Sequence, residues 1–364
     1  MTGALLPGES VSLALRGLYQ AYGYLRYRVG KFEEYDLYAR NRNFLADDRI
    51  LTFSDINGQV MALKPDVTLS IIKNTRGDDR TRKVWYTENV YRVPRGGYGF
   101  QEIRQTGLEC IGAVDLYTMG EVLMLAARSL RTISEEYVLE VSHMGILTGL
   151  FAAENVPAEL TGPILAAFGE KNPHSLRELC ERGRLSGGAR DLLAALCGLG
   201  GPAEETLPEL LALPLPAESR SAADELAALC RLLRAFGDFR IETDLSLTND
   251  TDYYNGVLFR GFVDGVASPV LAGGRYDHLL NRMGRSGAAI GFAVYLSELE
   301  RLMERPREYD ADTLLVYDEG CDPAAVAARA NALTAEGKTV RVQLRGEAAV
   351  SCREIEEVTG WNGC

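Results

Sequence analysis

The chain has 364 residues, 46% of them hydrophobic and 25% charged, which predicts a globular protein of two or three domains. The net charge of −12 argues against nucleic-acid binding, because the basic residues are scattered among acidic ones and form no basic patch. Residues 1–30 show no signal-peptide pattern, and no apolar run approaches the ~18 residues of a membrane span. We therefore predict a cytoplasmic protein that binds neither nucleic acid nor membrane.

The seven cysteines are widely spaced and contain no CxxC pair, which favours reduced thiols over disulfides or a zinc site. The three histidines, His143, His174 and His278, are too dispersed for an obvious metal site. We expect no metal and no cofactor.

The first expected element is an amphipathic helix over residues 11–22, with Ser10 as its N-cap and Gly23 as its stop. An alternating pattern predicts a strand over residues 25–29. Short strands at 50–53 and 60–63 flank an Asn-Gly pair, the strongest short signal for a β-hairpin.

A helix is expected to follow Pro65 and Asp66 and to run through residue 76. Both residues suit a helix start, where free N–H groups and the helix dipole favour a carboxylate. Taken alone, Asp66 is therefore fully explained as a helix cap.

Residues 83–112 contain two β-rich runs around a Gly-rich loop. Counting in twos places six residues on one face of the second strand: Gln101, Ile103, Gln105, Gly107, Glu109 and Ile111. The glycine between Gln105 and Glu109 predicts open space beside two polar groups. Such a face suits a small polar ligand better than a packed core.

The rest of the chain predicts an α+β fold, an antiparallel sheet flanked by helices, because strands with hairpin chemistry alternate irregularly with helical segments. We expect one domain from residues 1–141 and 239–308, with residues 142–238 as a helical insertion. Residues 309–364 are expected to form a short C-terminal αβ segment, a reduced or truncated domain built from strands at 313–317 and 339–344 around one helix.

Five segments, in this order, resemble the catalytic domain of histidyl-tRNA synthetase, a class II aminoacyl-tRNA synthetase. They are LKPDVT at 63–68, YR at 91–92 with QTGLE at 105–109, DYYNG at 252–256, GGRYD at 273–277 and IGFA at 290–293. The helix and strand around Tyr24 resemble the family's dimer-forming first motif, although Gly30 replaces its proline. The resemblance covers roughly residues 5–305.

The resemblance implies a pocket for L-histidine. Asp66, Thr68 and Gln105 match the contacts to the ammonium group, and Glu109 and Tyr254 match the residues that read the imidazole. Tyr253 and Arg92 complete the implied histidine-binding set: Asp66, Thr68, Arg92, Gln105, Glu109, Tyr253 and Tyr254. Taken singly, the two tyrosines are equally well explained as ordinary strand aromatics.

Three positions depart from the family. Gln101, Asn249 and Glu298 align with arginines that bind ATP or stabilise the transition state in the synthetases. Losing one such donor typically costs about 100- to 1000-fold in rate. The resemblance therefore implies a chain without adenylation activity, a regulatory protein rather than an enzyme.

One branch of the family keeps the histidine-reading residues, loses the ATP-reading ones and lacks a full anticodon-binding domain. This branch is the regulatory subunit of ATP phosphoribosyltransferase. The resemblance implies a hetero-oligomer with the short-form catalytic subunit, feedback inhibition by L-histidine, and a homodimer core. The alternative is a divergent histidyl-tRNA synthetase or another amino-acid-activating ligase.

Overall fold

The computed structural model describes residues 7–41, 49–75, 80–93, 99–248, 254–303, 309–348 and 350–358. The chain divides into two compact units, Met1–Met303 and Glu304–Cys364, which are described separately below. Two residues of the expected site, Asn249 and Tyr253, lie outside the described residues.

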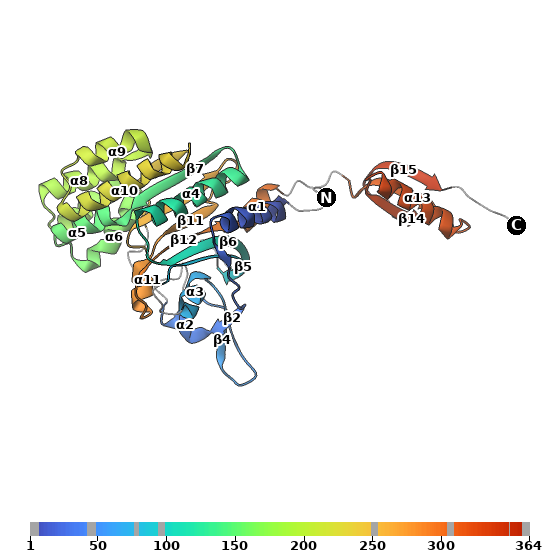
Figure 1. Cartoon of the computed structure of the whole chain (residues 1–364), viewed down its shortest axis with the longest axis horizontal. Helices are drawn as coiled ribbons and strands as arrows, with labels where there is room; N and C mark the ends of the chain where they lie inside the picture. Colours follow the sequence, from blue (N-terminus) through green and yellow to red (C-terminus); the bar gives the residue numbers. More distant parts are fainter. Residues whose placement is uncertain are drawn as a thin grey trace. The chain divides into compact units, whose positions relative to one another are not determined.

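The first unit is built on a nine-stranded sheet (Figure 1). In spatial order its strands are β1 (Leu25–Arg26), β5 (Arg82–Arg92), β6 (Gln101–Gly112), β12 (Ala288–Tyr295), β11 (Leu271–Arg275), β10 (Val257–Val263), β7 (Tyr137–His143), β9 (Ile241–Asp244) and β8 (Gly200–Pro202). The pairings β1–β5 and β7–β9 are parallel and the other pairings are antiparallel. The predicted α+β fold with an antiparallel sheet flanked by helices is confirmed.

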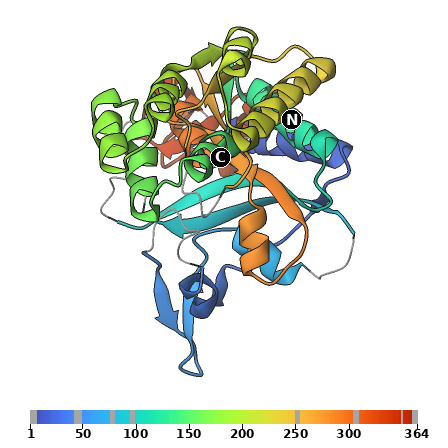
Figure 2. The same ribbon diagram turned by 90° about the vertical axis from the view of Figure 1, so that its left-hand side faces the viewer.

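One face of the sheet is covered by helices, as Figure 2 shows from the side. They are α1 (Pro7–Ala21), α4 (Leu116–Ile133) and α12 (Leu296–Met303). Alternate residues of the strands, such as Trp85, Leu108 and Phe292, are buried against them. This face holds the main hydrophobic core.

The other face of the sheet carries smaller elements. They are α2 (Tyr35–Ala39), α3 (Thr68–Asn74), α11 (Asp277–Arg282) and a three-stranded sheet of β2 (Phe32–Glu34), β4 (Val60–Leu63) and β3 (Thr52–Ser54). Leu69 and Ile72 of α3 pack in one cluster with Tyr86 and Val90 of β5. The polar residues Gln105 and Glu109 of β6 are buried on this face.

Six helices lie between β7 and β9: α5 (Met144–Ala153), α6 (Ala158–Gly169), α7 (Pro173–Arg182), α8 (Gly187–Gly198), α9 (Ala203–Ala212) and α10 (Ala217–Phe236). Their buried side chains, including Leu193 and Leu226, belong to the same core cluster as the sheet. The division of the first unit at residues 141 and 238 stays a prediction.

Helix α1 differs from expectation at its start and agrees at its end. It begins at Pro7, so Ser10 lies inside the helix and the prediction of Ser10 as N-cap is wrong. At its end Gly23 has φ +79°, and the amides of Gly23 and Tyr24 donate to the carbonyls of Gln20 and Tyr19. This is a Schellman motif, and Gly23 is confirmed as the helix stop.

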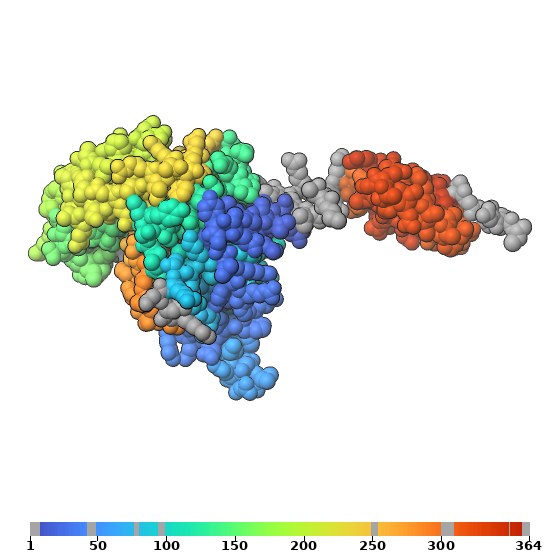
Figure 3. Space-filling view, viewed as in Figure 1, coloured from blue at the N-terminus to red at the C-terminus, as the bar shows by residue number. Residues whose placement is uncertain are grey.

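The predicted hairpin is confirmed, and in Figure 3 it projects from the first unit. Asp55 stabilises its turn, because its carboxylate accepts the amides of Asn57 and Gln59 at 2.8 Å each. Gly58 adopts φ +80°, which glycine tolerates without strain. The expected strand over 25–29 is shorter, since only Leu25 and Arg26 pair with β5.

The second unit is a small αβ unit. It contains β13 (Ala311–Tyr317), α13 (Pro323–Ala335), β14 (Val340–Leu344) and β15 (Cys352–Val358), with three parallel strands in the order β14–β13–β15. Strand β15 is missing from the sequence prediction because its glutamates do not read as a strand. In the fold, Glu354 and Glu356 pair with Lys338 and Arg329.

None of the helices in the described ranges is long and apolar enough to cross a membrane.

Candidate functional site

Glu109 of β6 lies at the centre of the candidate site. Its side chain is 2% exposed, and its two oxygens accept hydrogen bonds from Thr68 Oγ1 at 2.8 Å and from Tyr276 Oη at 2.5 Å. Burial raises the pKa of Glu109 to about 8, although the bonds from Tyr276 and Thr68 act in the opposite direction. A carboxyl group held in this way is available to a ligand both as a proton donor and as an acceptor.

The segment between β4 and α3 brings Asp66 and Thr68 to this group. Asp66 accepts the amide of Leu69 at 2.9 Å, so it does act as a helix cap. Burial raises the pKa of Asp66, while the Leu69 amide and the nearby charge of Arg92 lower it. The helix-cap explanation and the ligand explanation for Asp66 are therefore compatible, since one of its oxygens serves the cap.

Gln105 lies on the same face of β6 and is 5% exposed. Among the described residues its side-chain amide has no hydrogen-bond partner. A polar ligand would supply a hydrogen-bond partner for this amide.

The predicted open space at Gly107 is wrong. A Cβ there would lie 2.7 Å from Tyr86 Oη and 2.3 Å from the backbone oxygen of Phe292. The Tyr86 ring from the neighbouring strand fills the position, since Tyr86 pairs with Gly107. The glycine therefore permits a close approach between strands.

Two other glycines make room for the site. A Cβ on Gly291 of β12 would lie 1.7 Å from Glu109 Oε2, and a Cβ on Gly274 of β11 would lie 2.6 Å from the ring of Tyr254. Gly291 pairs with both Glu109 and Gly274. The glycines thus let Glu109 and Tyr254 lie flat over the sheet.

Tyr254 precedes β10 rather than forming part of it. Burial raises the pKa of its phenol well above the ordinary value, and the nearby Tyr295, Glu109 and Asp66 raise it further. The structure therefore brings together Asp66, Thr68, Glu109 and Tyr254, with Arg92 close to Asp66. Gln105 lies on the same face of β6, opposite Tyr295 of β12.

Two of the three expected degenerate positions, Gln101 and Glu298, fall in the described part of the chain. Gln101 is exposed at the start of β6, where it pairs with Arg92 at the end of β5. Glu298 lies on α12 and accepts a hydrogen bond from Ser268 at 3.4 Å. The alignment of these positions with synthetase arginines stays a prediction.

Sequence reasoning missed two tyrosines of the site, Tyr276 and Tyr86. Tyr276 is 2% exposed and donates to Glu109, and Tyr86 is 2% exposed beside Gly107. Tyr276 belongs to the GGRYD segment at 273–277, and its place in this family motif could have indicated a role in the site. For Tyr86 the only indication was weaker: it lies opposite Gly107 when the two β-rich runs are paired as a hairpin.

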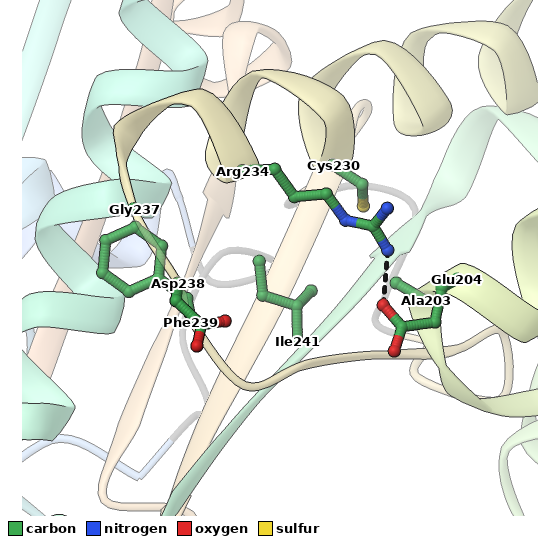
Figure 4. Close-up of a pocket in the computed structure, with 8 residues that line it drawn as sticks. All are labelled: Ala203, Glu204, Cys230, Arg234, Gly237, Asp238, Phe239 and Ile241. Atoms are coloured by element: carbon green, nitrogen blue, oxygen red, sulfur yellow. Dashed lines mark hydrogen bonds and ion pairs between the residues drawn. The ribbon is translucent and has the colours of Figure 1, made fainter.

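A separate cavity of about 230 Å³ lies between α9, the end of α10 and β9 (Figure 4). Its lining residues are Ala203, Glu204, Cys230, Arg234, Gly237, Asp238, Phe239 and Ile241. Arg234 and Glu204 pair with each other across it. None of the expected histidine-binding residues lines this cavity.

The donor set of the site suits an organic ligand. Within the described ranges, no group of three or more His, Cys, Asp or Glu side chains is arranged to hold a metal ion. Asp66 offers a carboxyl group, Gln105 an amide, and Glu109 a carboxyl group of raised pKa. This combination fits a small molecule that carries an ammonium group and a second polar group.

Comparisons with known proteins show the family of the chain. The family model described as histidyl-tRNA synthetase matches residues 8–299. An ATP phosphoribosyltransferase regulatory subunit from Desulfitobacterium hafniense is 31% identical over 329 residues, which cover 85% of this chain and 83% of that protein.

Two solved structures share the fold. An ATP phosphoribosyltransferase regulatory subunit/histidyl-tRNA synthetase from Bacillus halodurans aligns with a TM-score of 0.78 at 22% identity, covering 97% of this chain and 94% of that one. A chain of the ATP phosphoribosyl transferase complex from Thermotoga maritima aligns with a TM-score of 0.63 at 20% identity, covering 79% of this chain and 97% of that one. The chain therefore belongs to the histidyl-tRNA synthetase family and, within it, to the ATP phosphoribosyltransferase regulatory subunits.

Proposed function

We propose that this chain is a non-catalytic subunit that activates a short-form ATP phosphoribosyltransferase and makes it sensitive to L-histidine. The observation that carries the proposal is the 31% identity, over 85% of the chain, to a protein named as such a subunit. The solved Thermotoga maritima complex, which shares this fold, supports a partnership with the transferase.

The pocket supports histidine as the effector. The amino group of the ligand would face Asp66, Thr68 and Gln105, where the charge of Asp66 offsets that of the ammonium. The imidazole would face Glu109 and Tyr254. An analogue without two ring nitrogens would leave a buried polar group unpaired, which gives the pocket its selectivity.

The absence of catalysis belongs to the same proposal. Arg92 remains near Asp66, but Gln101 and Glu298 offer no guanidinium to a triphosphate. Feedback further requires that histidine favour the less active complex, through a coupling of typically about 1–3 kcal/mol between pocket and partner. We also propose a homodimer core and a cytoplasmic location for the complex.

The test is reconstitution of the purified chain with a short-form ATP phosphoribosyltransferase from the same genome. Transferase activity should appear only with both chains and should fall when histidine is added. Light scattering would give the composition of the complex. Histidine-dependent exchange of pyrophosphate into ATP by this chain alone would instead identify an amino-acid-activating ligase.

Substitutions in the pocket should separate binding from assembly. Glu109→Ala and Asp66→Ala should each weaken histidine binding at least tenfold by calorimetry and relieve inhibition, while the complex still forms. Asp115→Ala is the matched control, because Asp115 caps α4 through the Thr118 amide at 2.8 Å and is exposed. Unchanged histidine affinity in both pocket variants would exclude this pocket as the histidine site.

A further inference from the structure

An ion pair between a buried lysine, Lys64, and a partly exposed glutamate, Glu88, lies beside the candidate pocket. Lys64 is fully buried, and its Nζ is 2.6 Å from Glu88 Oε2 and 3.4 Å from the backbone oxygen of Val29. Glu88 also accepts the Val29 amide at 3.3 Å. None of these residues matches a ligand contact of the family resemblance.

The ion pair joins the two parts of the chain that supply the ammonium contacts. Lys64 ends the β4 segment two residues before Asp66, and its carbonyl accepts the amide of Tyr91 on β5 at 2.9 Å. Glu88 lies on β5 directly opposite Gln105 of β6, with both side chains on the pocket face. The Lys64–Glu88 ion pair therefore connects the segment that carries Asp66 to the strand pair that carries Gln105.

A buried charge restricts geometry more than an apolar contact does. A lysine ammonium removed from water is tolerated only when it is paired and hydrogen-bonded, so the positions open to Lys64 are few. Pro65 links Lys64 to Asp66 and has a fixed φ, so the backbone between the two residues has little freedom. A restricted position of Lys64 therefore also restricts the position of Asp66. The pair thus limits how far Asp66 can move relative to Gln105.

We propose that the Lys64–Glu88 pair is a positioning element that sets the spacing of the ammonium contacts and so the affinity for an α-amino ligand. This inference rests on the proposed function, because it concerns the same pocket. It predicts that the pair matters for ligands with an amino group and not for the imidazole contacts at Glu109.

The chain offers a matched control on the opposite face of the same strand. Lys83 of β5 pairs with Glu121 of α4 at 2.6 Å, and Glu121 is 4% exposed and also accepts from Tyr24. The two pairs share chemistry, distance and strand. Only the Lys64–Glu88 pair lies on the pocket face.

The experiment compares Glu88→Gln with Glu121→Gln in the full chain. Calorimetry would measure the affinity for histidine, for histidinol, which keeps the amino group, and for imidazole propionate, which lacks it. Thermal melting would report stability. Glu88→Gln should weaken histidine and histidinol about tenfold and imidazole propionate less than twofold, as expected for one perturbed hydrogen bond to a charged group. Glu121→Gln should lower the melting temperature and leave the three affinities within twofold.

The outcomes are distinguishable. Equal losses for all three ligands, or unchanged histidine affinity in Glu88→Gln, would overturn the positioning role and leave the proposed function intact. Wild-type protein that binds no histidine would overturn both. If Glu88→Gln does not fold, Lys64→Met combined with Glu88→Met removes both charges without leaving one unpaired. This double variant should show the same selective loss of amino ligands.

Discussion

The two faces of the strand pair β5–β6 differ in what they contribute. On the helix-covered face, Trp85, Leu108 and Cys110 are packed against α1 and α4. On the pocket face, Gln105 and Glu109 alternate with these residues and are equally buried. Alternate residues of one strand therefore have different roles. Those on the covered face stabilise the fold, and those on the pocket face provide polar groups for a ligand.

The pocket face weakens the fold that supports it. Burial raises the pKa of Glu109 to about 8, so its ionisation opposes folding increasingly as the pH rises from the unfolded value of ~4.3. The covered face compensates, since each fully buried large apolar side chain contributes about 1.5–3 kcal/mol.

The largest effect is expected from Leu108→Ala on the covered face. Leu108 is fully buried, so the cavity and the lost apolar burial should lower the free energy of unfolding by about 2–5 kcal/mol. Denaturant unfolding would measure this change. Histidine affinity in the folded variant should stay within twofold of wild type, and a tenfold loss would show that the two faces are not independent.

Gly291→Ala should disrupt the pocket face. The new Cβ would lie 1.7 Å from Glu109 Oε2 and 2.5 Å from the backbone oxygen of Leu108, so the carboxyl group must move. We expect histidine affinity to fall about 100-fold, roughly 2.7 kcal/mol. Gly17→Ala on α1 is the control, because its Cβ meets nothing within 4 Å. Wild-type histidine affinity in Gly291→Ala would show that Glu109 does not contact the ligand.

A smaller effect is expected from pH. If Glu109 and the ligand imidazole share one proton, binding releases a proton below the imidazole pKa of ~6.5 and takes one up above the Glu109 pKa of about 8. Histidine affinity should therefore be highest between these values and fall about tenfold per pH unit outside them. Glu109→Gln removes the titrating group, so at pH values below the pKa of the ligand's α-ammonium its affinity should fall only on the acid side. If the histidine affinity of Glu109→Gln also falls between about pH 8 and the pKa of the ligand's ammonium, a group other than Glu109 causes the loss of affinity at high pH.

The sequence predicts the pocket face of β6 because strand alternation is local. Gln105 and Glu109 are four residues apart in one strand, so their common face follows from the sequence itself. Tyr276 could not be placed, since its contact with Glu109 depends on strand order, and β6 lies next to β12 far along the sequence. Gly107 was misread because a strand glycine marks either space or close approach, and only the neighbour Tyr86 decides between them.

Charge pairing explains why strand β15 was not predicted from the sequence. Strand β15 carries four charged residues in seven, a composition that argues against a strand when it is read alone. The cations that neutralise it, such as Lys338 and Arg329, come from segments that the sequence does not visibly associate with it.

The parallel pairing of β7 with β9 bears on how this fold accommodates variation in length. Leu139 pairs with Ile241, so six helices fill the connection between two adjacent strands. The entropy of loop closure grows only with the logarithm of length, at about 0.6 kcal/mol per doubling. Helices that bury their own side chains more than offset such a cost. The length of this connection can therefore vary at small entropic cost where the helices that share the core of the sheet, such as α5 and α10, are kept.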